Sequence, residues 1–545
     1  MSSKVEVIIV GGGVSGLTFS HCLRKAGLSY VVLEKGSEIC FHGGASIGLM
    51  PHGLRILDQL GLCDQILSLT VPVATSTSRL SNGKKFRHSY LLAELEKRHG
   101  YPTTFFEREE LLQVLYRNIP DKQNVKTSQQ VTGIELGDNQ VTVVTRQGQT
   151  WQAPIVVGAD GIHSFVRQAI WKEIEQKNKG ASLNQSQSIM ADYYCIFGVS
   201  VYKSDDPEFG EGSGHANFDH ERSTVVVNSS RNKHFWFLIL KFDKRQKYPN
   251  IPRFGDKDME KTATENQDLM VTEHTSFAHL WRLRTKCAMV PLEEVVFDVW
   301  YANRMVLLGD SAHKVTPNAG QGGNSAIESA AVLANRLHKA KQTYGNLAAM
   351  HTTSITNLFQ QYYSDRNGVK EMSQTSGFVT RLHAQDSRML KVIGRHIFPF
   401  LGDNFDLNAM SNYMIGAPTL DFVEVKTKPA SIPWEGWTIP SPTSSSKEGG
   451  PSALGTLTTL AILGLFLGSW TYARKEAELS AIPRLNSSIL STADNPSPST
   501  ILPSLVSEEP QPWADLAILL NTLPMAAIIA SESFRVKNLS LVSAM

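Results

Sequence analysis

A glycine-rich turn near the N-terminus constrains this chain more than any other feature. Gly11, Gly13 and Gly16 form a G-x-G-x-x-G pattern directly after the apolar run Val7–Val10. The first glycine permits a tight turn from strand to helix, the second lets the backbone approach a pyrophosphate, and the third lets the helix pack on the sheet. The helix predicted over residues 15–26 would then direct its free N–H groups at the phosphates.

A second apolar run, Tyr30–Leu33, ends in Glu34. This carboxylate comes 18 residues after Gly16 (34 − 16), close to the spacing of roughly 20 residues at which an acid binds ribose hydroxyls in dinucleotide-binding folds. Two strands with a helix between them predict a βαβ unit, and therefore an α/β fold with a Rossmann-like parallel sheet. The alternative, a glycine-rich turn with an incidental acid, is disfavoured by this context.

Two later segments repeat the pattern of a buried strand that delivers an acid to its carboxyl end. Residues 155–158 lead into Ala159 and Asp160, and residues 305–308 lead into Gly309 and Asp310. In open α/β sheets, ligands bind at the carboxyl ends of the strands. A Pro/Gly-rich turn and a helical run over 325–340 follow the second acid, so we expect both acids to lie near the first glycine turn.

Composition excludes several classes of protein. The 545 residues allow about three domains or fewer, and 41% hydrophobic residues supply ample core. The net charge of +2 (53 − 51) provides no overall field for nucleic acid. Five scattered cysteines argue against a disulfide scaffold and for a reducing compartment. No secretory signal is predicted, because Glu6 interrupts the first apolar run, and no metal site is predicted.

The C-terminal quarter differs in character. Residues 401–450 are predicted as a linker, Pro- and Ser-rich toward the end, and residues 451–473 carry no charge and are long enough to cross a bilayer as a helix. A polar linker isolates this segment, which disfavours the alternative of a buried core helix. A second polar linker, 474–512, precedes the apolar stretch 513–530, which is either a second span or an interfacial helix. The orientation stays open.

The three motifs, in this order and spacing, resemble the FAD-dependent monooxygenases of the para-hydroxybenzoate hydroxylase type. The match spans roughly residues 5–400, and the string at 309–324 is its most specific part. With the apolar C-terminal segment, the chain looks most like the fungal epoxidases of indole-diterpene and meroterpenoid biosynthesis. The resemblance implies a Rossmann-like FAD-binding domain built from residues 1–180 and 296–400, with an inserted mixed β-sheet substrate domain at 181–295.

The resemblance also assigns cofactor contacts position by position. Glu34 would bind the adenosine ribose, Arg108 the diphosphate region, and Gly48 would lie along the flavin. Asp160 would sit in a turn that serves flavin and nicotinamide nucleotide together, and Asp310 would bind the ribityl chain or diphosphate. Together with the first turn, the predicted cofactor-binding residues are Gly11, Gly13, Gly16, Glu34, Gly48, Arg108, Asp160, Asp310, Gly323 and Asn324.

Gly323 and Asn324 are expected against the isoalloxazine ring. The N–H groups at the start of the following helix would stabilise negative charge on the reduced flavin. His313 is expected to order the loop before this helix rather than to transfer protons. By resemblance, NADPH or NADH reduces FAD, and the reduced flavin reacts with O2 to transfer one oxygen atom to the substrate.

The substrate implied by the resemblance is a prenyl-chain alkene of a terpenoid, meroterpenoid or indole-diterpene intermediate. Strand-like runs at 193–199, 223–227 and 234–240 would line its pocket. The catalytic residues stay unknown, with the region of His215 and Phe218 as candidates, because related enzymes often have a tyrosine near the position that aligns with Phe218. An alkene needs no deprotonation, so a site without a base fits epoxidation.

Two alternatives stay open: an aromatic-ring hydroxylase of the same flavin family, and a flavin-bearing membrane scaffold without turnover. The leading interpretation implies a membrane-tethered protein, in the endoplasmic reticulum with its catalytic domain facing the cytosol. Its partners would be the prenylated substrate, O2 and the membrane, with functional coupling to a membrane terpene cyclase and no nucleic acid. Tethering would raise the encounter rate with a substrate that partitions into the bilayer.

Overall fold

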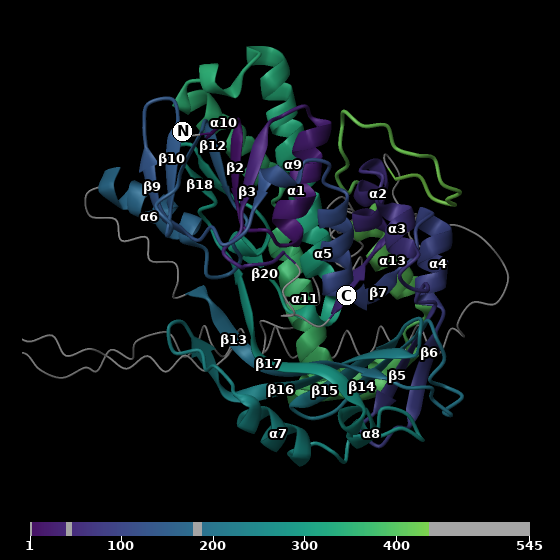
Figure 1. Ribbon diagram of the computed structural model, residues 1–545. Helices are drawn as coiled ribbons and strands as arrows, with labels where there is room; N and C mark the ends of the chain where they lie inside the picture. The colour runs from purple at the N-terminus through teal and green to yellow at the C-terminus, as the bar shows by residue number, and fades with distance from the viewer. Residues whose placement is uncertain (1–2, 40–45, 178–187, 435–545) are drawn as a thin grey trace, which may run out of the picture. The chain divides into compact units, whose positions relative to one another are not determined.

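Apolar runs that end in glycine turns or acids build the central sheet. The computed structural model describes residues 3–39, 46–177 and 188–434. Every residue of four neighbouring parallel strands is buried, as expected for a sheet covered on both faces. Within the described part, this sheet has six strands (Figure 1), in the order β18 (Tyr301–Ala302), β19 (Met305–Leu307), β12 (Ile155–Gly158), β2 (Val7–Val10), β3 (Tyr30–Leu33) and β8 (Val125–Lys126).

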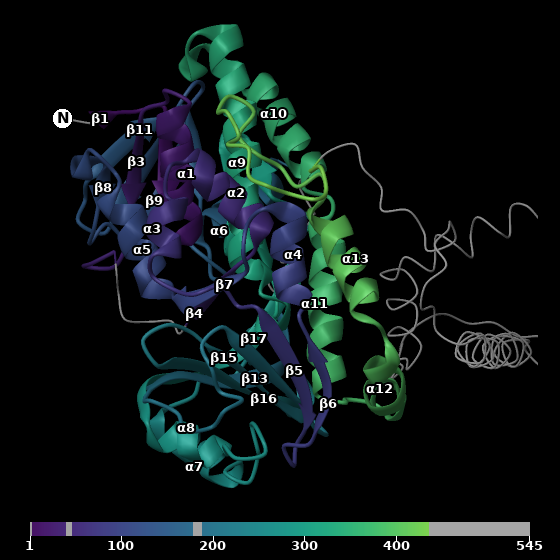
Figure 2. The same cartoon turned by 90° about the vertical axis from the view of Figure 1, so that its right-hand side faces the viewer.

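Helices cover this sheet. α1 (Val14–Lys25) follows the first glycine turn, and α9 (Gln321–Tyr344) lies beside it (Figures 1 and 2). α5 (Arg108–Arg117) contacts α1, and α6 (Phe165–Lys177) packs against β12, β18 and β19. The strands and helices predicted around the glycine turns are therefore confirmed. A smaller sheet follows the order β1 (Ser3–Lys4), β11 (Thr150–Ala153), β10 (Val141–Thr145) and β9 (Val131–Leu136).

A second large sheet confirms the predicted mixed β region. The runs predicted at 193–199, 223–227 and 234–240 form its middle strands. Among the described residues it has eight strands, in the order β20 (His313–Lys314), β17 (Arg284–Val296), β13 (Met190–Val201), β16 (Lys233–Lys247), β15 (Arg222–Asn228), β14 (Ser213–Phe218), β5 (Thr75–Leu80) and β6 (Lys85–Ser89).

Alternation along these strands gives the sheet two different faces. Ile196, Trp236 and Leu238 pack with α7 (Asp256–Glu265) and α8 (Phe277–Arg282) on one face. Cys195 and Ile239, one position away, pack toward the segment that ends α11 (Val369–His383) on the opposite face. Figure 1 shows α7 and α8 below the sheet and α11 above it. This two-residue period follows directly from the pleat of a strand, and it decides which side chains meet the FAD-binding part.

The domain boundaries differ from those expected. The second sheet is not confined to residues 181–295, because β5 and β6 extend it and β5 pairs in parallel with β14. This pairing joins segments more than a hundred residues apart, for example Thr77 with His215. No local sequence pattern specifies a partner at such a separation, so the prediction placed the boundary where the motifs changed.

The segment after residue 400 also differs from the predicted linker. α13 occupies Asp403–Met414, with Leu407 and Met414 buried, and Leu420 enters the main core. These apolar side chains keep the first part of the 401–450 segment on the surface of the FAD-binding part. The membrane segments predicted at 451–473 and 513–530 lie outside the described residues. Among the helices that are described, none combines the length and apolar character needed to cross a bilayer.

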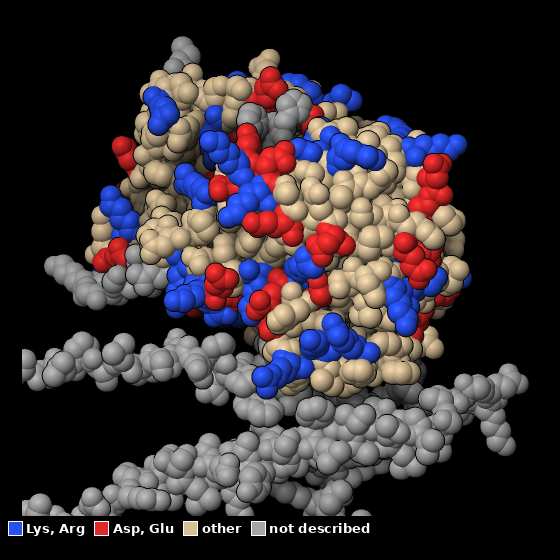
Figure 3. Space-filling view, turned by 90° about the horizontal axis from the view of Figure 1, so that it is seen from below, with Lys and Arg blue, Asp and Glu red and all other residues tan. Residues whose placement is uncertain are grey.

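The described elements belong to one compact unit of the chain. Basic and acidic side chains are mixed on the visible lower surface (Figure 3), a pattern that gives short-range ion pairs rather than a strong field of one sign.

The remaining elements are β4 (Ser46–Leu49), β7 (Thr104–Glu107), α2 (Pro51–Gln59), α3 (Cys63–Leu67), α4 (Leu91–His99), α10 (Thr352–Asp365), α12 (Arg388–Val392), and the short helical turns η1 (Lys122–Asn124), η3 (Gly309–Ser311), η4 (Pro317–Ala319), η5 (Leu347–Ala349), η6 (Ile393–Ile397) and η7 (Phe398–Phe400).

Candidate active site

The predicted cofactor-binding motifs meet at one edge of the six-stranded sheet. β19, β12, β2 and β3 run parallel and adjacent, so their carboxyl ends lie at the same edge. Gly309 follows β19 closely, Asp160 follows β12, Gly11 follows β2 and Glu34 follows β3. The fold therefore brings four segments that are far apart in the chain to the position where open α/β sheets bind ligands. We call this the nucleotide-binding edge.

Two glycines of the first turn have no room for a side chain. Gly11 has a φ of +108°, and a Cβ there would lie 2.4 Å from the carbonyl oxygen of Ala159. A Cβ on Gly16 would lie 2.0 Å from the carbonyl oxygen of Gly11. Gly13 is different, because the nearest atom to its Cβ position is a guanidinium nitrogen of Arg108 at 3.8 Å. The turn is closed against the sheet and open toward Arg108.

This opening fits the diphosphate of FAD. Gly13 is the N-cap of α1, no side chain caps that end, and its first turn carries no acid. Uncapped N–H groups and the helix dipole favour an anion, and the Arg108 guanidinium beside Gly13 adds a fixed positive charge. Gly320 is likewise an N-cap of α9 without a side-chain cap or an acid in the first turn. The residues present therefore fit the cofactor.

Glu34 lies against the glycine turn, as the spacing predicted. One of its carboxylate oxygens accepts a hydrogen bond from the Gly12 N–H (2.6 Å), and the other accepts from the Gly36 N–H (2.8 Å). A carboxylate oxygen accepts more than one hydrogen bond, so Glu34 keeps capacity for ribose hydroxyls while it fixes the turn.

Asp160 has a structural role in addition to its predicted one. Its Oδ2 accepts hydrogen bonds from the N–H groups of Phe165 (2.7 Å) and Val166 (3.3 Å) at the start of α6. Its Oδ1 is buried with no hydrogen-bond partner among the described residues, and burial raises the pKa of this carboxyl group. An unpartnered buried oxygen beside the first glycine turn is a second observation that fits a polar ligand here.

The Gly309–Asp310 motif touches α1 directly. Gly309 has a φ of +65°, and a Cβ there would lie 2.1 Å from the Ser15 hydroxyl oxygen. Asp310 pairs with Lys314, and its side chain is 36% exposed, so the carboxylate faces the surface of the nucleotide-binding edge. A few residues on, His313 Nε2 lies 3.1 Å from Ser329 Oγ. Burial lowers the pKa of His313 to about 3, so this histidine stays neutral and holds the loop.

The remaining predicted residues join β4 to α9. Asn324 accepts from the Met50 N–H (3.0 Å) and donates to the carbonyl oxygens of Gly48 (3.1 Å) and Gly320 (2.8 Å). A Cβ on Gly323 would lie 2.5 Å from Ile47 Cδ1. The Asn324 amide therefore holds the start of α9 against β4 rather than pointing into open space.

A largely apolar cavity of about 220 Å³ lies between this junction and the large sheet. Gly48 and the turn 317–320 border it on the FAD-binding side, and Val225, Val227 and Phe237 border it on the sheet side. Its lining contains no Asp, Glu, Lys, Arg or Tyr among the described residues. The full lining set is Gly48, Met50, Val73, Ser76, Leu92, Thr103, Phe105, Gly214, His215, Ala216, Val225, Val226, Val227, Phe237, Ile239, Pro317, Asn318, Ala319, Gly320 and His383.

The two catalytic candidates from the sequence do not present a reactive group to this cavity. His215 borders it, but its ring stacks on Phe209 at 5.4 Å, and burial lowers its pKa to about 4. Phe218 is completely buried and packs on Phe86 and His383. We therefore assign neither residue a chemical step. The sequence predicted that β14 borders the site, but it did not predict on which face of the sheet each side chain of β14 lies.

Sequence reasoning missed His383, which borders the cavity from the last turn of α11. Burial lowers the pKa of His383 to about 4. No motif surrounds it, and it reaches the cavity only because α11 crosses the large sheet. A histidine that follows an apolar helical face at the helix end was the one available signal, and this signal is weak without the fold.

A cluster of charges fixes Arg108 at the nucleotide-binding edge. Glu107 is the N-cap of α5, and its carboxylate accepts hydrogen bonds from Lys233 and Lys286 (both 2.6 Å). Burial alone would raise the pKa of Glu107, but the hydrogen bonds from both lysines lower it overall. Glu110 also accepts from Lys233 (3.0 Å). These pairs join the large sheet to the helix that begins with Arg108.

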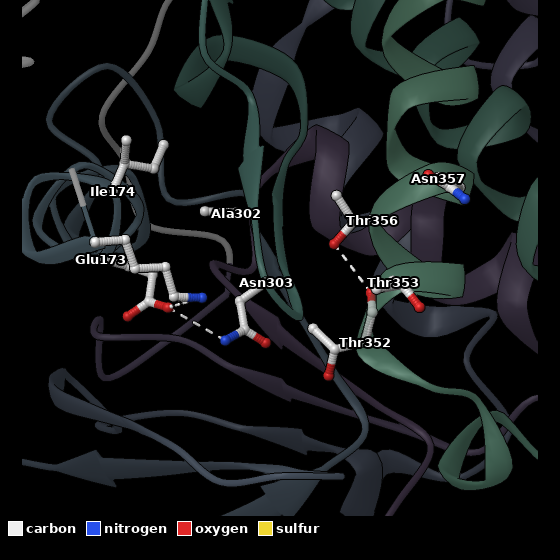
Figure 4. A pocket seen from close by; sticks show the side chains of 9 residues that line it. Glu173, Ile174, Ala302, Asn303, Thr352, Thr353, Thr356 and Asn357 are labelled. Atoms are coloured by element: carbon white, nitrogen blue, oxygen red, sulfur yellow. Dashed lines mark hydrogen bonds and ion pairs between the residues drawn. The ribbon is translucent and has the colours of Figure 1, made fainter.

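A second groove, of about 360 Å³, lies away from these motifs. Glu173 of α6 and Asn303 are 3.3 Å apart on one side, and the threonines at the start of α10 line the other (Figure 4). None of the predicted cofactor-binding residues lines it. We therefore take the cavity beside Gly48, and not this groove, as the candidate substrate site.

Comparison with known proteins agrees with this geometry. Residues 4–352 match the family model of an FAD binding domain. The FAD-dependent monooxygenase atmM of Aspergillus flavus is 37% identical over 438 residues, which cover 79% of this chain and 90% of that protein. The FAD-dependent monooxygenase ausM of Penicillium brasilianum is 37% identical over 403 residues, 73% of this chain and 83% of that protein.

Solved structures with lower sequence identity share the fold. Klebsiella pneumoniae HpxO, complexed with FAD and uric acid, superposes with a TM-score of 0.61 at 19% identity and covers 76% of this chain and 97% of its own. Pseudomonas aeruginosa PqsL, in complex with 2-aminobenzoylacetate, gives a TM-score of 0.55 at 15% identity and covers 72% of this chain and 100% of its own. At this identity the likeness concerns the fold alone.

Proposed function

This chain belongs to the FAD-dependent monooxygenases, and from that premise we propose that it uses NADPH or NADH and O2 to epoxidise a prenyl-chain alkene. The proposed substrate is a terpenoid, meroterpenoid or indole-diterpene intermediate of fungal secondary metabolism. The observation that carries the proposal is the cavity beside Gly48, because its walls suit an isoprenoid chain and offer no strong base.

Each part of the protein has a separate task. FAD, when bound, accepts hydride from the nicotinamide and reacts with O2, and the protein supplies binding, orientation and exclusion of water. The uncapped start of α1 and Arg108 would hold the diphosphate, and Glu34 and Asp310 would bind hydroxyl groups. The uncapped start of α9 would stabilise negative charge on the ring system beside Gly320. Apolar walls would keep water from the reacting atoms.

The described lining of the cavity offers no strong base, which favours an alkene over a phenol. Hydroxylation of a phenolic ring is assisted by removal of the phenol proton, which needs a group of suitable pKa within hydrogen-bond reach. Both histidines that border the cavity, His215 and His383, have pKa values lowered by burial to about 4. They are weak bases, whereas an alkene is nucleophilic without deprotonation. Aromatic-ring hydroxylation stays the second candidate, supported by the shared family.

Product analysis separates these two reactions. The purified holoenzyme, supplied with NADPH, O2 and prenylated aromatic probes, is expected to yield a product that gains one oxygen atom in the prenyl chain, with oxirane signals in the proton NMR spectrum. Oxygen on a ring carbon would instead establish the hydroxylase. Omitting NADPH and then substituting NADH identifies the electron donor in the same assay.

We further propose that residues 451–473 tether the catalytic part to the endoplasmic-reticulum membrane on its cytosolic side. A prenylated substrate partitions into the bilayer, and a membrane terpene cyclase would open the epoxide product there. The uncharged composition of this segment supports the proposal. Deleting residues 451–545 is expected to release an FAD-containing protein into the soluble fraction. Loss of FAD with aggregation would show instead that the tail belongs to the core.

A further inference from the structure

The corner that follows α11 is firmly attached to the large sheet. The carbonyl oxygen of His383 accepts a hydrogen bond from the Asp219 N–H (3.2 Å), and the Ala384 carbonyl accepts from the Glu221 N–H (2.7 Å). Two residues further on, Asp386 accepts from the Tyr193 hydroxyl (2.7 Å) and pairs with Lys241. The His383 ring is therefore held at the cavity by a rigid support rather than by a flexible loop.

One polar contact distinguishes the two nitrogens of the His383 ring. Asn318 Nδ2 lies 3.5 Å from His383 Nδ1, and Asn318 Oδ1 accepts from the Thr380 hydroxyl (2.9 Å). In this orientation of the amide, Asn318 Nδ2 is the donor toward Nδ1, an arrangement that assigns the ring hydrogen to Nε2. Among the described residues, the contact with Asn318 is the one hydrogen bond of this ring, and His383 lines the cavity.

The ring is neutral under ordinary conditions. Burial lowers the pKa of His383 to about 4, and no acid borders the cavity to offset this effect. A neutral imidazole with its hydrogen on Nε2 donates a hydrogen bond to an oxygen atom but forms no ion pair with a carboxylate. The rest of the lining is apolar except for the amide of Asn318, the ring of His215 and two hydroxyl groups, those of Ser76 and Thr103.

We propose that His383 is a substrate-binding residue that donates a hydrogen bond from Nε2 to a hydroxyl or carbonyl oxygen of the substrate. The inference rests on the proposed function, and it narrows the substrate class to prenyl chains that carry such an oxygen. A single directional hydrogen bond in an apolar cavity determines which end of the substrate's prenyl chain enters. It therefore also determines which double bond of the substrate lies beside Gly48 and Gly320. His383 thus selects the site of oxygen transfer without taking part in it.

The test compares two probes that differ only in this oxygen. Farnesol and the hydrocarbon that lacks its hydroxyl group are titrated into the oxidised, full-length holoenzyme in one detergent, and binding is followed by the perturbation of flavin absorbance. The wild type is expected to bind the alcohol about tenfold more tightly than the hydrocarbon, the usual effect of one buried hydrogen bond. His383→Phe is expected to bind both equally, and His383→Gln, which retains a donor, is expected to keep most of the preference.

Controls separate this contact from a general structural effect. FAD content and the thermal midpoint report folding of each variant. His338→Phe makes the same exchange on α9, where the ring stacks on Phe422 at 4.2 Å and does not line the cavity, and is expected to leave the preference unchanged. Thr103→Val tests whether the substrate oxygen binds the Thr103 hydroxyl instead of His383. Thr103 Oγ1 is buried at the cavity and has no hydrogen-bond partner among the described residues.

Three results would overturn the inference. They are an unchanged preference in His383→Phe, loss of the preference in Thr103→Val alone, and no binding of either probe to the wild type, which would also refute a prenyl-binding cavity. The proposed reaction fails separately. If the preference depends on His383 while products carry oxygen only on an aromatic ring, the epoxidase assignment is wrong and the substrate-binding role of His383 stands.

Discussion

The nucleotide-binding edge and the candidate substrate cavity lie in one protein but are built in opposite ways. The edge is made of backbone, where a single methyl group on Gly16 would come within 2.0 Å of a carbonyl oxygen. The cavity is made of side chains such as Val225 and Phe237, and it encloses about 220 Å³. In the first region, a side chain at Gly11 or Gly16 has no room, so we expect a change there to disturb the cofactor. The second can change its shape by substitutions that leave the cofactor in place.

This difference would allow the cavity side chains to change for different substrates while the FAD-binding part stays the same. N–H groups and a few charges would hold a cofactor that does not vary, whereas one side of the cavity comes from the separate large sheet. Substitutions should therefore fall into two groups, one that removes FAD and one that leaves FAD bound but changes turnover. Substitutions at Gly16, Asp310, Val225 and His313 test that division.

Gly16→Ala is expected to have the largest effect. The new Cβ would collide with the Gly11 carbonyl, so the turn must shift, with loss of bound FAD and a decrease of about 2–4 kcal/mol in the free energy of unfolding. FAD content of the purified protein and denaturant unfolding measure both. The control is Gly210→Ala, since nothing lies within 4 Å of a Cβ at Gly210. A Gly16→Ala variant that retains FAD would contradict the assignment of this turn.

Asp310→Ala is expected to weaken FAD binding by about 10- to 100-fold, because a charged hydrogen bond to a cofactor hydroxyl contributes about 1.5–3 kcal/mol. Asp310 is partly exposed and paired with Lys314, so folding should change little. Asp310→Asn keeps an acceptor and should retain more affinity. Fluorescence titration of the apoprotein with FAD measures the difference, and equal affinities for all three proteins would remove Asp310 from the site.

Val225→Phe tests the other region. The larger ring would occupy part of the cavity, so substrate-stimulated NADPH oxidation should fall about tenfold or more while FAD content stays unchanged. Val225→Ala enlarges the cavity instead and is expected to shift selectivity between prenyl probes of different length. Loss of FAD in Val225→Phe would show that the two regions are not independent.

His313, in β20 between the two regions, gives the smallest effect on function, because the expected change is in folding stability alone. Its folded pKa of about 3 lies below the unfolded value near 6.5. The stabilisation is therefore complete above pH 6.5 and is lost as the pH falls toward 3, because the unfolded chain binds the proton more readily. Through this residue, lowering the pH from 7 to 5 should decrease the free energy of unfolding by about 2 kcal/mol. Urea unfolding of His313→Gln should show a flatter pH dependence, whereas identical curves would exclude this role.

Much of the nucleotide-binding edge could be predicted from the sequence. Glycine turns, short apolar strands and the spacing to Glu34 are local signals, and parallel strands bring their carboxyl ends together automatically. The local roles were harder to foresee. Asp160 caps α6 and Asn324 joins β4 to α9, because which atoms an amide or carboxylate meets depends on neighbours from remote segments.

The cavity could not be predicted to the same extent. The strands that carry Val225 and Phe237 were recognised, but β5 joins the sheet through a parallel pairing with β14 across more than a hundred residues. The pleat directs His215 toward Phe209, and the crossing of α11 brings in His383. A sequence pattern records that a residue alternates or follows a helix, but it does not record which distant element covers that face.

A crystal structure of the full-length protein with FAD would show whether the glycine turn and the cavity serve one cofactor. The account predicts the diphosphate between the start of α1 and Arg108, and the isoalloxazine ring beside Gly48 and Gly320 with one face open to the cavity. A flavin ring that is separated from this cavity by protein, or a diphosphate bound elsewhere than at the glycine turn, would contradict it.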